Sequence, residues 1–506
     1  MDVFSQLLNG FQVVFQPVNF LYCFIGVFVG QLIGVLPGIG PVGAMSVLLP
    51  VTFGVPPVTG VIMLSGIYYG AMYGGTITSV LVNIPGEAAT AITCLDGYQM
   101  AKKGRAGPAL GIAAMGSFIG GTVSLIFLML LVYPLAEIAV KFGPPEYFAL
   151  MCMGLTVVAY LAKGSLIKAI IMAILGLVLG CIGTDIISGK IRFVFGIEKL
   201  SDGLDIVPLA MGLFGISEVL TNIEKPFKRK IFETGKIRHL LPNIEDWKRS
   251  LRPIIRGTFI GFFLGILPGG GSILSSFVSY STEKRISKHP EEFGWGAIEG
   301  VAGPETANNA ATAGAFIPLL ALGIPPNVVM AILLGALLIH GITPGPLFIK
   351  QHPDVFLGTI ASMYIGNGML LLLNLPLIGI WVRVLKIPIR ILFPLILLFC
   401  LIGSYAVNNS VFDIIVMIIF GVVGYILRKF KYEEAPLLLA FILGPMLEQA
   451  FRQSLVMSSG DLSIFLIRPI SCIAILLSFA LLFSTVFNVF WKARTKISKI
   501  ENNNND

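Results

Sequence analysis

Two short runs rich in glycine and proline are the residues of this chain best suited to hold a ligand inside a membrane. The first run is Gly34 to Gly40 (GVLPGIG), and the second is Gly265 to Gly271 (GILPGGG). Both lie in strongly apolar surroundings, where proline and consecutive glycines break a helix. Hydrocarbon supplies no water for the freed backbone groups, so such breaks survive only inside protein or beside a wet cavity. Two broken apolar segments at matching places in two halves are typical of a transporter binding site.

The chemistry that these tips offer is anion binding. Glycine lets backbone N–H groups approach a ligand closely, and a helix that starts just after the tip directs its positive end to the same place. This arrangement suits a carboxylate and needs no buried arginine. The alternative interpretation is tight helix packing, for which membrane helices also use small residues. The candidate substrate-binding residues at the tips are Gly38, Ile39, Gly40 and Ser46 in the first half, and Gly269, Gly270, Gly271 and Ser272 in the second.

A second group of polar residues has helical spacing in each half. Thr76, Ser79 and Asn83 follow one face of a helix at i, i+3 and i+7. The second half offers Glu305, Asn308, Asn309 and Thr312. Asparagine both donates and accepts hydrogen bonds, so these rows are expected to bind substrate or to lend oxygens to a sodium ion. The candidate ion-coupling residues are Asn83, Glu305 and Asn309. The alternatives are hydrogen bonding between helices without a ligand and, for Glu305, a position at the membrane interface.

The remaining ionisable residues show no arrangement typical of catalysis. The four histidines lack metal or triad spacing, and the chain has no nucleophile elbow and no phosphate-binding Gly-Lys-Ser/Thr loop. We therefore expect no enzyme, no metal centre and no cofactor, with an ion gradient or another subunit supplying the energy. Six further acids lie near expected helix ends, where capping or solvation is the default: Glu87, Asp96, Asp185, Glu218, Asp413 and Glu448.

The elements that position these residues are expected to be membrane helices. The chain has 506 residues, 56% hydrophobic and 12% charged, with a mean hydropathy of +0.88, whereas soluble domains carry about 25% charged residues. The composition predicts an all-α polytopic membrane protein of about twelve spans. The net charge of +8 lies in short loops, which indicates the positive-inside pattern and not nucleic-acid binding. Clear spans are Leu110–Tyr133, Leu166–Cys181, Val355–Trp381, Ile391–Tyr405, Ile414–Leu427 and Ile464–Phe490.

The chain is expected to contain two membrane repeats, residues 1–221 and 253–491. A basic cytoplasmic linker, residues 222–252, separates them, and residues 492–506 form a cytoplasmic tail. Each half carries a second break after its Leu-Pro-Gly run, at Ile84-Pro85-Gly86 and at Ile324-Pro325-Pro326. Two ordered pairs of breaks favour an internal duplication over coincidence.

Loop charges predict that the two repeats are inverted. In the first half, the loop 53–59 between the breaks is uncharged, and the cations follow the second break, at Lys102, Lys103 and Arg105. In the second half the order is reversed, with Lys284, Arg285 and Lys288 between the breaks and only Lys350 in the loop 341–354. Corresponding loops then face opposite sides of the membrane, unless the few charges are distributed by chance. Basic flanks on both sides of Pro253–Tyr280 predict a re-entrant hairpin with the second tip at its turn, and we expect the two tips to meet near the midplane.

In these motifs the sequence resembles the large membrane subunit of the tripartite tricarboxylate transporters, the TctA type. The matching stretches cover nearly the whole chain in order: Gly34–Pro41, Tyr69–Glu87 (YGAMYGGTITSVLVNIPGE), Leu95–Leu110 (LDGYQMAKKGRAGPAL), Gly265–Gly271, Phe293–Ala310 (FGWGAIEGVAGPETANNA), Leu322–Pro326 and Pro344–Pro346.

The resemblance implies a permease of about twelve spans in the bacterial inner membrane. It also implies two partners: a small membrane subunit of the TctB type and a periplasmic solute-binding protein of the TctC type. Uptake in this family is driven by a cation gradient, often of sodium, and its namesake substrates are tricarboxylates such as citrate. One departure is Pro326, where the family usually has glycine. Proline lacks the backbone N–H, which puts a shared substrate in doubt if that donor contacts substrate.

The predicted function is therefore secondary-active import of tricarboxylates or related carboxylates, with no nucleic-acid partner. Access to the site would alternate by rocking or by elevator-like sliding, and both remain open. One alternative is a self-sufficient symporter for a carboxylate or another small anion that needs no binding protein. Two further alternatives are an ion channel, which should show a continuous polar lining, and an intramembrane enzyme, which should show an acid–base or metal cluster.

Overall fold

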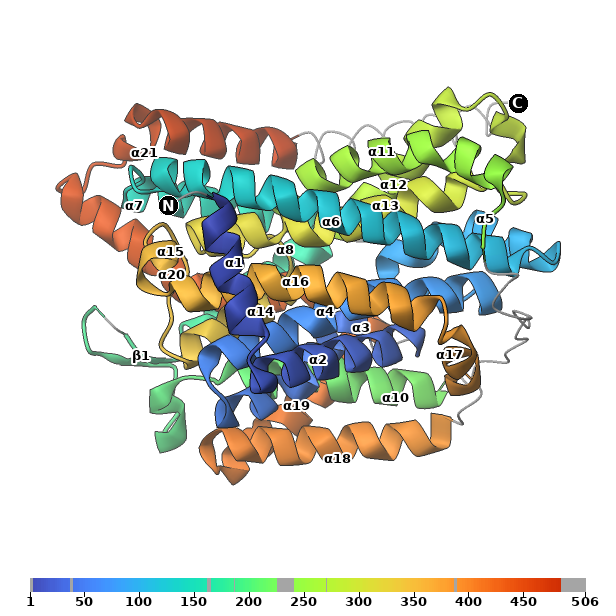
Figure 1. Cartoon of the computed structure of the whole chain (residues 1–506). Coiled ribbons are helices and arrows are strands. Elements are labelled where there is room, and N and C mark those ends of the chain that lie inside the picture. Colours follow the sequence, from blue (N-terminus) through green and yellow to red (C-terminus); the bar gives the residue numbers. More distant parts are fainter. Residues whose placement is uncertain are drawn as a thin grey trace, which may run out of the picture. The chain divides into compact units, whose positions relative to one another are not determined.

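The computed structural model describes residues 3–36, 40–161, 165–185, 187–224, 241–269, 271–385 and 389–483 (Figure 1). In chain order, its elements are α1 Val3–Val14, α2 Pro17–Val35, α3 Gly40–Leu48, η1 Leu49–Gly54, α4 Pro57–Val82, η2 Ala88–Ala91, α5 Thr93–Lys102, α6 Ala106–Ala139, α7 Pro144–Leu161, α8 Leu166–Gly180, β1 Gly183–Thr184, β2 Ile191–Arg192, η3 Glu198–Asp202, α9 Ile206–Ala210, η4 Met211–Ile216, α10 Ser217–Glu224, α11 Ile244–Ile266, α12 Gly271–Ile286, η6 Pro290–Glu292, α13 Glu299–Gly314, η7 Pro318–Leu322, α14 Val328–Ile339, α15 Phe348–Gln351, α16 Pro353–Asn374, α17 Ile378–Val384, α18 Ile389–Asn408, α19 Val411–Lys429, α20 Ala435–Met457 and α21 Ile464–Ile467. Elements labelled η are short 3₁₀ helices, except η4 and η7, which are π-helical.

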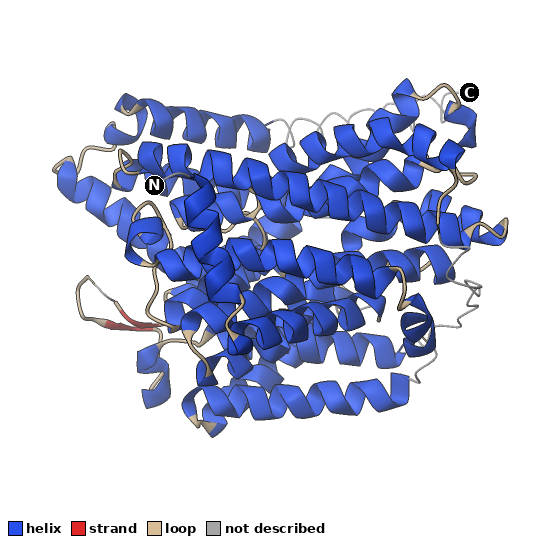
Figure 2. Ribbon diagram, viewed as in Figure 1, coloured by secondary structure: helices blue, strands red, loops and turns tan. Residues whose placement is uncertain are grey.

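The predicted all-α fold is confirmed. Helices make up most of the described chain, and one small hairpin of two antiparallel strands, β1 and β2, interrupts them (Figure 2). Within the described residues, five helical segments are long and apolar enough to cross a membrane: 17–35, 106–139, 206–224, 353–374 and 411–429. Five shorter apolar helices accompany them, at 40–54, 166–180, 328–339, 393–408 and 469–483.

Two of the spans that the sequence predicts as single continuous helices are interrupted. The span expected at Val355–Trp381 divides into α16 and α17, with Pro376 in the turn between them. The span expected at Ile464–Phe490 is interrupted after Ile467, because Arg468 is extended ahead of Pro469, and helix resumes over 469–483. In both places proline removes a backbone donor and disfavours helix in the residue before it, so the prediction of single spans was wrong.

Glycine stripes hold the principal helix pair of each repeat together. A Cβ atom added to Gly26, Gly30 or Gly34 of α2 would lie 2.2–2.5 Å from carbonyl oxygens of α4, those of Met63, Ile67 and Ala71 respectively. The pair α11 and α13 repeats this pattern: Gly257, Gly261 and Gly265 approach the carbonyls of Gly303, Ala307 and Ala311 within 2.2–2.5 Å. Only glycine permits backbones to pack this closely. The duplication read from the sequence therefore exists as matching backbone contacts.

The glycine contacts also show which residues of the two repeats are equivalent. Gly34 corresponds to Gly265 and Ala71 to Ala311, because each pair occupies the same place in its stripe. Counting along from the alanines pairs Ile84-Pro85 with Ile324-Pro325, which is the match made from the sequence. It also pairs Asn83 with Gly323, and both of these residues end their helices in the left-handed conformation.

The two repeats run in opposite directions. In Figure 1, α5, which follows α4, lies at the right edge, whereas α15, which follows α13 through η7 and α14, lies at the left. The basic residues Lys102, Lys103 and Arg105 lie at and just after the end of α5, while the uncharged loop 341–347 follows α14. The opposite directions explain why the loop charges are reversed between the halves.

The contact pattern divides the chain into two compact units that do not coincide with the expected halves. One unit contains residues 1–140 and 205–430, and the other contains residues 141–204 and 431–506. Of the expected linker, residues 225–240 lie outside the described residues, and α11 begins within it at Ile244, capped by Asn243. The assignment of sequence repeats to residues 1–221 and 253–491 stays a prediction.

Ion pairs stabilise the second unit. Arg452 and Arg192 pair with Asp185 and Glu448 at 2.8 Å, which ties the β1–β2 hairpin to α20. The backbone of α8 also packs closely on α20, since a Cβ at Gly176 would lie 2.2 Å from the Leu437 carbonyl oxygen. The candidate site residues belong to the other unit, which is described next.

Candidate functional site

Both predicted helix breaks are present. Helix α2 ends at Val35 and α3 begins at Gly40, while α11 ends at Ile266 and α12 begins at Gly271. Gly40, Gly269 and Gly271 have φ angles of 63°, 75° and 48°, a left-handed conformation that favours glycine. Helices α11 and α12 pack against each other, which confirms the hairpin in the second half. Gly38, Ile39 and Gly270 lie outside the described residues.

Each tip contacts the second break of its own repeat. The Gly269 N–H group donates a hydrogen bond of 2.7 Å to the Pro326 carbonyl oxygen. In the first repeat, the corresponding Gly86 packs so closely that a Cβ would lie 2.2 Å from the Gly34 carbonyl oxygen. Pro326 therefore lacks a donor, as the sequence indicates, but its carbonyl holds the tip.

A link between the second tip and the first repeat runs through Asn327. Its Nδ2 lies 3.9 Å from the position of a Cβ on Gly271 and donates to the Tyr68 hydroxyl at 3.3 Å. Its Oδ1 accepts from the Met330 N–H group and so caps α14. The expected meeting of the two tips involves residues outside the described chain and stays a prediction.

The serines beside the tips are buried. Ser46 is fully buried, and its hydroxyl donates to the Val42 carbonyl one turn back in α3 at 2.8 Å. Ser272 is 7% exposed at the start of α12. The Ser46 proton is thus committed to its own helix, and a ligand at the first tip would meet the lone pairs of that oxygen.

The row on α4 is only partly assembled as expected. Thr76 donates to Glu305 Oε2 at 2.5 Å, and Ser79 donates to Thr90 Oγ1 at 2.9 Å. Asn83 does not continue this face, because α4 ends at Val82 and Asn83 is an exposed residue with φ of 59°. The expectation that Asn83 shares the face of Thr76 and Ser79 was wrong, since a left-handed residue leaves the helical periodicity.

The row on α13 is buried along its whole length. Glu305, Asn308, Asn309 and Thr312 are each at most 4% exposed. Every residue of α13 is buried, as is every residue of α4 from Thr59 to Val82. Protein therefore encloses Glu305, and its depth in the membrane stays a prediction. The rows do not occupy equivalent positions, because the register pairs Glu305 with Ser65 and the two asparagines with Tyr68 and Tyr69.

Hydroxyl groups surround the Glu305 carboxylate. Thr76 donates to one oxygen, and Thr93 of α5 donates to the other. The backbone carbonyl of Glu305 accepts from Ser117 Oγ and from Asn309 Nδ2, both at 3.2 Å. Ser117 also accepts from Asn309 at 2.8 Å. Residues from α4, α5, α6 and α13 thus converge on one acid.

Glu87 is a functional candidate that the sequence analysis placed among the capping residues. It does cap η2, accepting from the Ala89 N–H group at 2.9 Å. It is also only 8% exposed, and it accepts from Asn308 Nδ2 at 3.3 Å. Its position directly after the Ile84-Pro85-Gly86 break was the sequence feature that could have indicated a second role.

The other acids noted in the sequence have partners that explain them. Asp96 accepts N–H groups from Gly294, Gly296 and Ala297 at 2.7–2.9 Å, and the Tyr280 hydroxyl at 2.9 Å. Asp185 and Glu448 pair with arginines, as described above, and Glu218 pairs with Arg428. Asp413 accepts from Asn408 Nδ2 at 3.0 Å. These contacts are structural.

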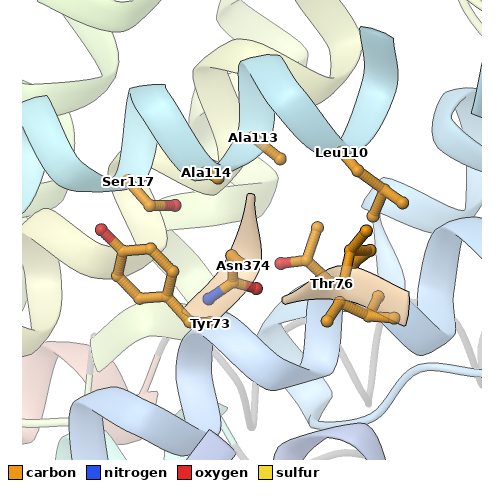
Figure 3. Close-up of a pocket in the computed structure, with 9 residues that line it drawn as sticks. Tyr73, Thr76, Leu110, Ala113, Ala114, Ser117 and Asn374 are labelled. Carbon is orange, nitrogen blue, oxygen red and sulfur yellow. The ribbon is translucent and has the colours of Figure 1, made fainter. Parts of the chain in front are cut away.

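Two small cavities adjoin the polar rows. One, of about 10 Å³, is lined by Tyr73, Thr76, Ser117 and Asn374 among others, and Figure 3 shows Thr76 and Ser117 facing it from α4 and α6. The other, of about 20 Å³, is lined by Tyr69, Asn309, Thr312 and Asn367 among others. A cavity of roughly 10–15 Å³ holds one water molecule. Each of these two cavities therefore accommodates about one water or one small ion, and neither accommodates a tricarboxylate.

Comparison with known proteins gives a consistent result. A family model described as the tripartite tricarboxylate transporter TctA family matches residues 20–439. An uncharacterised 52.8 kDa protein in the TAR-I ttuC′ 3′ region of Agrobacterium vitis is 51% identical over 471 residues, covering 93% of this chain and 94% of that protein. A second uncharacterised Agrobacterium vitis protein, in the TAR-II ttuC′ 3′ region, is 56% identical over 211 residues, covering 42% of this chain and 87% of its own. No solved structure matches the chain.

Proposed function

Because this chain belongs to the TctA family of tripartite tricarboxylate transporters, we propose that it is the permease subunit of a secondary transporter that imports a carboxylate. The bacterial inner membrane is its proposed location. A small membrane subunit of the TctB type and a periplasmic solute-binding protein of the TctC type are its proposed partners. The binding protein would deliver tricarboxylates or related carboxylates, and a cation gradient, proposed to be of sodium, would drive uptake.

The observation that carries this proposal is the contact between broken backbone and buried polar side chains in two matching repeats. The second tip hydrogen-bonds to the break at Pro326, and that break leads through Asn327 to Tyr68 of the other repeat. Unwound backbone of this kind inside a membrane protein is typical of transporter substrate sites. Gly269 and Gly271 at the second tip, with Gly40 at the first, supply positions where backbone groups can meet a carboxylate.

The proposed substrate site extends from the tips to the polar rows on α4 and α13. The tip residues with Ser272 would bind the carboxylate groups, and Thr76, Ser79, Asn308, Asn309 and Thr312 would bind its hydroxyls. Ser46 would line the first tip without donating to the carboxylate, because its hydroxyl donates to Val42. Glu305 and Asn309 are proposed to couple substrate to the cation. Asn83, expected from the sequence to share both roles, is exposed and lies outside this proposed site.

Alternating access is the proposed transport mechanism, and the small size of the two cavities beside the polar rows supports it. The cavities of about 10 and 20 Å³ are far below the size of a tricarboxylate. In the proposed mechanism one part of each repeat moves against the other to admit substrate, as in transporters with inverted repeats. The glycine-packed pairs α2–α4 and α11–α13 are the parts expected to move as rigid bodies, because their backbones are in contact along several turns.

The test is uptake of labelled carboxylates into proteoliposomes that contain this chain and its small membrane partner. We expect uptake only when the binding protein is added outside and a sodium gradient points inward. A permease with Gly269→Val serves as the inactive control, since valine does not tolerate φ of 75°. Uptake without the binding protein would favour the self-sufficient symporter, and gradient-independent flux would favour a channel.

A further inference from the structure

Two buried acids of this protein, Glu87 and Glu305, contact neighbouring residues of the same two helices. Five other buried acids of the described chain pair with an arginine: Glu146, Asp185, Asp246, Glu283 and Glu299. Asp96 and Asp413 are also buried, and they accept hydrogen bonds from neutral donors instead. Glu87 and Glu305 form no ion pair within the residues that the structure describes. Burying a carboxylate without a compensating cation is costly, and a second carboxylate nearby increases that cost.

The two acids lie close together between the same two helices. Asn308, which donates to Glu87, is one turn from Glu305 on α13. Thr76, which donates to Glu305, follows Gly75 on α4, and a Cβ at Gly75 would lie 3.0 Å from Cγ of Glu87. The contacts of the two acids therefore lie on adjacent residues of α4 and about one turn apart on α13.

Unpartnered oxygens lie in the same place. Asn308 Oδ1 and Asn309 Oδ1 are buried and have no hydrogen-bond partner. Asn308 is 1% exposed, and because its Nδ2 is bonded to Glu87, its Oδ1 lies beside the acid pair. A buried carbonyl oxygen without a donor is expensive unless a cation or a water satisfies it.

The oxygen atoms around Glu87 and Glu305 indicate which class of ligand binds there. No group of three or more histidine, cysteine, aspartate or glutamate side chains that could hold a metal occurs in the described ranges. Neutral oxygens must then complete the coordination, as they do for hard cations and not for transition metals that prefer nitrogen or sulfur.

We propose that Glu87 and Glu305, with Thr76, Thr93 and Asn308, form a binding site for a sodium ion. The proposal rests on the proposed function only in making this ion the coupling ion. Glu87, Thr76 and Thr93 come from the first repeat, and Glu305 and Asn308 come from the second. An ion held here joins the two repeats across the α4–α13 contact, so its arrival and departure change how firmly the repeats are held together.

Helix α5 connects this site to the loop before α13. Thr93 contacts Glu305, and Asp96, one turn later on the same helix, binds three N–H groups of the loop 294–297. A shift of α5 on ion binding is therefore transmitted to that loop. Because α12 leads into this loop, ion binding is also transmitted to the hairpin of α11 and α12.

The experiment measures thermal unfolding of the purified full-length protein in detergent, without substrate or partners, at increasing NaCl. Choline chloride keeps the ionic strength constant. We expect sodium to raise Tm in a saturable way, because an ion that binds only the folded state stabilises it. Glu305→Gln and Glu87→Gln should each abolish the sodium-dependent shift.

A matched pair of threonine variants distinguishes a loss of sodium affinity from misfolding. Thr76→Val should weaken the apparent sodium affinity about tenfold, because it removes a hydroxyl that contacts Glu305. Thr78→Val should leave the affinity unchanged, since the Thr78 hydroxyl donates instead to the Val35 carbonyl at 2.6 Å. Both threonines are buried on α4, two residues apart.

Three outcomes would overturn the proposal: no effect of sodium on the native protein, an effect that survives both glutamine variants, or equal effects of Thr76→Val and Thr78→Val. A Tm that depends on pH through Glu305 but not on sodium would overturn it in favour of a proton. Because this experiment measures no transport, a negative result does not contradict the proposed carboxylate import. Loss of import alone would leave the sodium site standing.

Discussion

The two repeats share their backbone architecture but differ in chemistry. Both place three glycines of one helix against carbonyl oxygens of the next, at distances that no side chain tolerates. Yet Glu305 of α13 corresponds to Ser65 of α4, and Asn308 corresponds to Tyr68. The duplicated part is thus the scaffold that allows two similar bodies to move. Glu305 has no acidic counterpart at the equivalent position of the first repeat.

The contact between α4 and α13 also combines matching backbones with different side chains. Thr76 of α4 meets Glu305 of α13 through a hydrogen bond. The pseudo-equivalent of Thr76 is Phe316, and its ring lies 6.4 Å from that of Tyr68. One end of the α4–α13 contact is therefore polar and the other aromatic, although the backbones that carry them match.

Labelling should test the inversion itself, with an all-or-none result. A cysteine at Val55 follows η1 of the first repeat, and a cysteine at Ser287 follows α12 of the second. Because corresponding loops face opposite sides, an impermeant thiol reagent added outside intact cells should label only the first. Labelling of both positions from the same side would refute the inverted arrangement.

Gly269→Val should abolish uptake while the protein remains in the membrane. A branched residue is strained at φ of 75°, and the N–H group that bonds to Pro326 would move. Gly40→Val tests whether the first tip also requires glycine, since Gly40 has φ of 63°. Uptake rates normalised to membrane protein measure both, and normal uptake by Gly269→Val would contradict a site at the tip.

Glu305→Gln should lower the uptake rate at least a hundredfold, whereas Ser65→Ala at the equivalent position should change it less than twofold. The glutamine removes the charge that the proposed ion needs. The Ser65 hydroxyl is buried without a partner, so its removal costs little. The comparison uses initial uptake rates under a sodium gradient, and equal losses in the two variants would remove the distinction between the repeats.

Gly261→Ala should destabilise the protein by about 2–4 kcal/mol, since its Cβ would lie 2.2 Å from the Ala307 carbonyl oxygen. Gly26→Ala should behave alike, with the same 2.2 Å approach to Met63. Gly368→Ala is the control, because nothing lies within 4 Å of its Cβ position and alanine favours helix by about 0.5–1 kcal/mol. Thermal unfolding measures the three, and a stable Gly261→Ala would show that the stripe tolerates separation.

Asn309→Ala should have the smallest effect, a several-fold change in apparent affinity for substrate or sodium. Its Nδ2 bonds to Ser117 and to the Glu305 carbonyl, so the loss acts on the acid's surroundings and not on the acid. Tyr69→Phe at the equivalent position removes only a hydroxyl that donates to Ser362 O at 3.2 Å. Kinetics as a function of sodium and substrate measure the effect, and unchanged constants for both would make Asn309 structural.

Local features of the sequence were sufficient for the breaks, the duplication and most of the buried row. The Leu-Pro-Gly and Ile-Pro runs break helices wherever they occur, and periodicity placed Glu305, Asn308, Asn309 and Thr312 together. Periodicity failed at Asn83, because it does not reveal where a helix stops. Nor does periodicity show that the polar rows of the two repeats occupy different positions, which the glycine contacts reveal.

The sequence by itself determined that this is a membrane protein of duplicated, broken helices, because composition, proline and glycine act within a few residues along the chain. Only the tertiary structure decided which groups meet. Thr93 and Thr76 are 212 and 229 residues from the acid they contact, and Glu87 is 221 residues from Asn308. Such contacts depend on how helices pack in three dimensions. The absence of an arginine beside Glu87 and Glu305 is visible only after that packing is known.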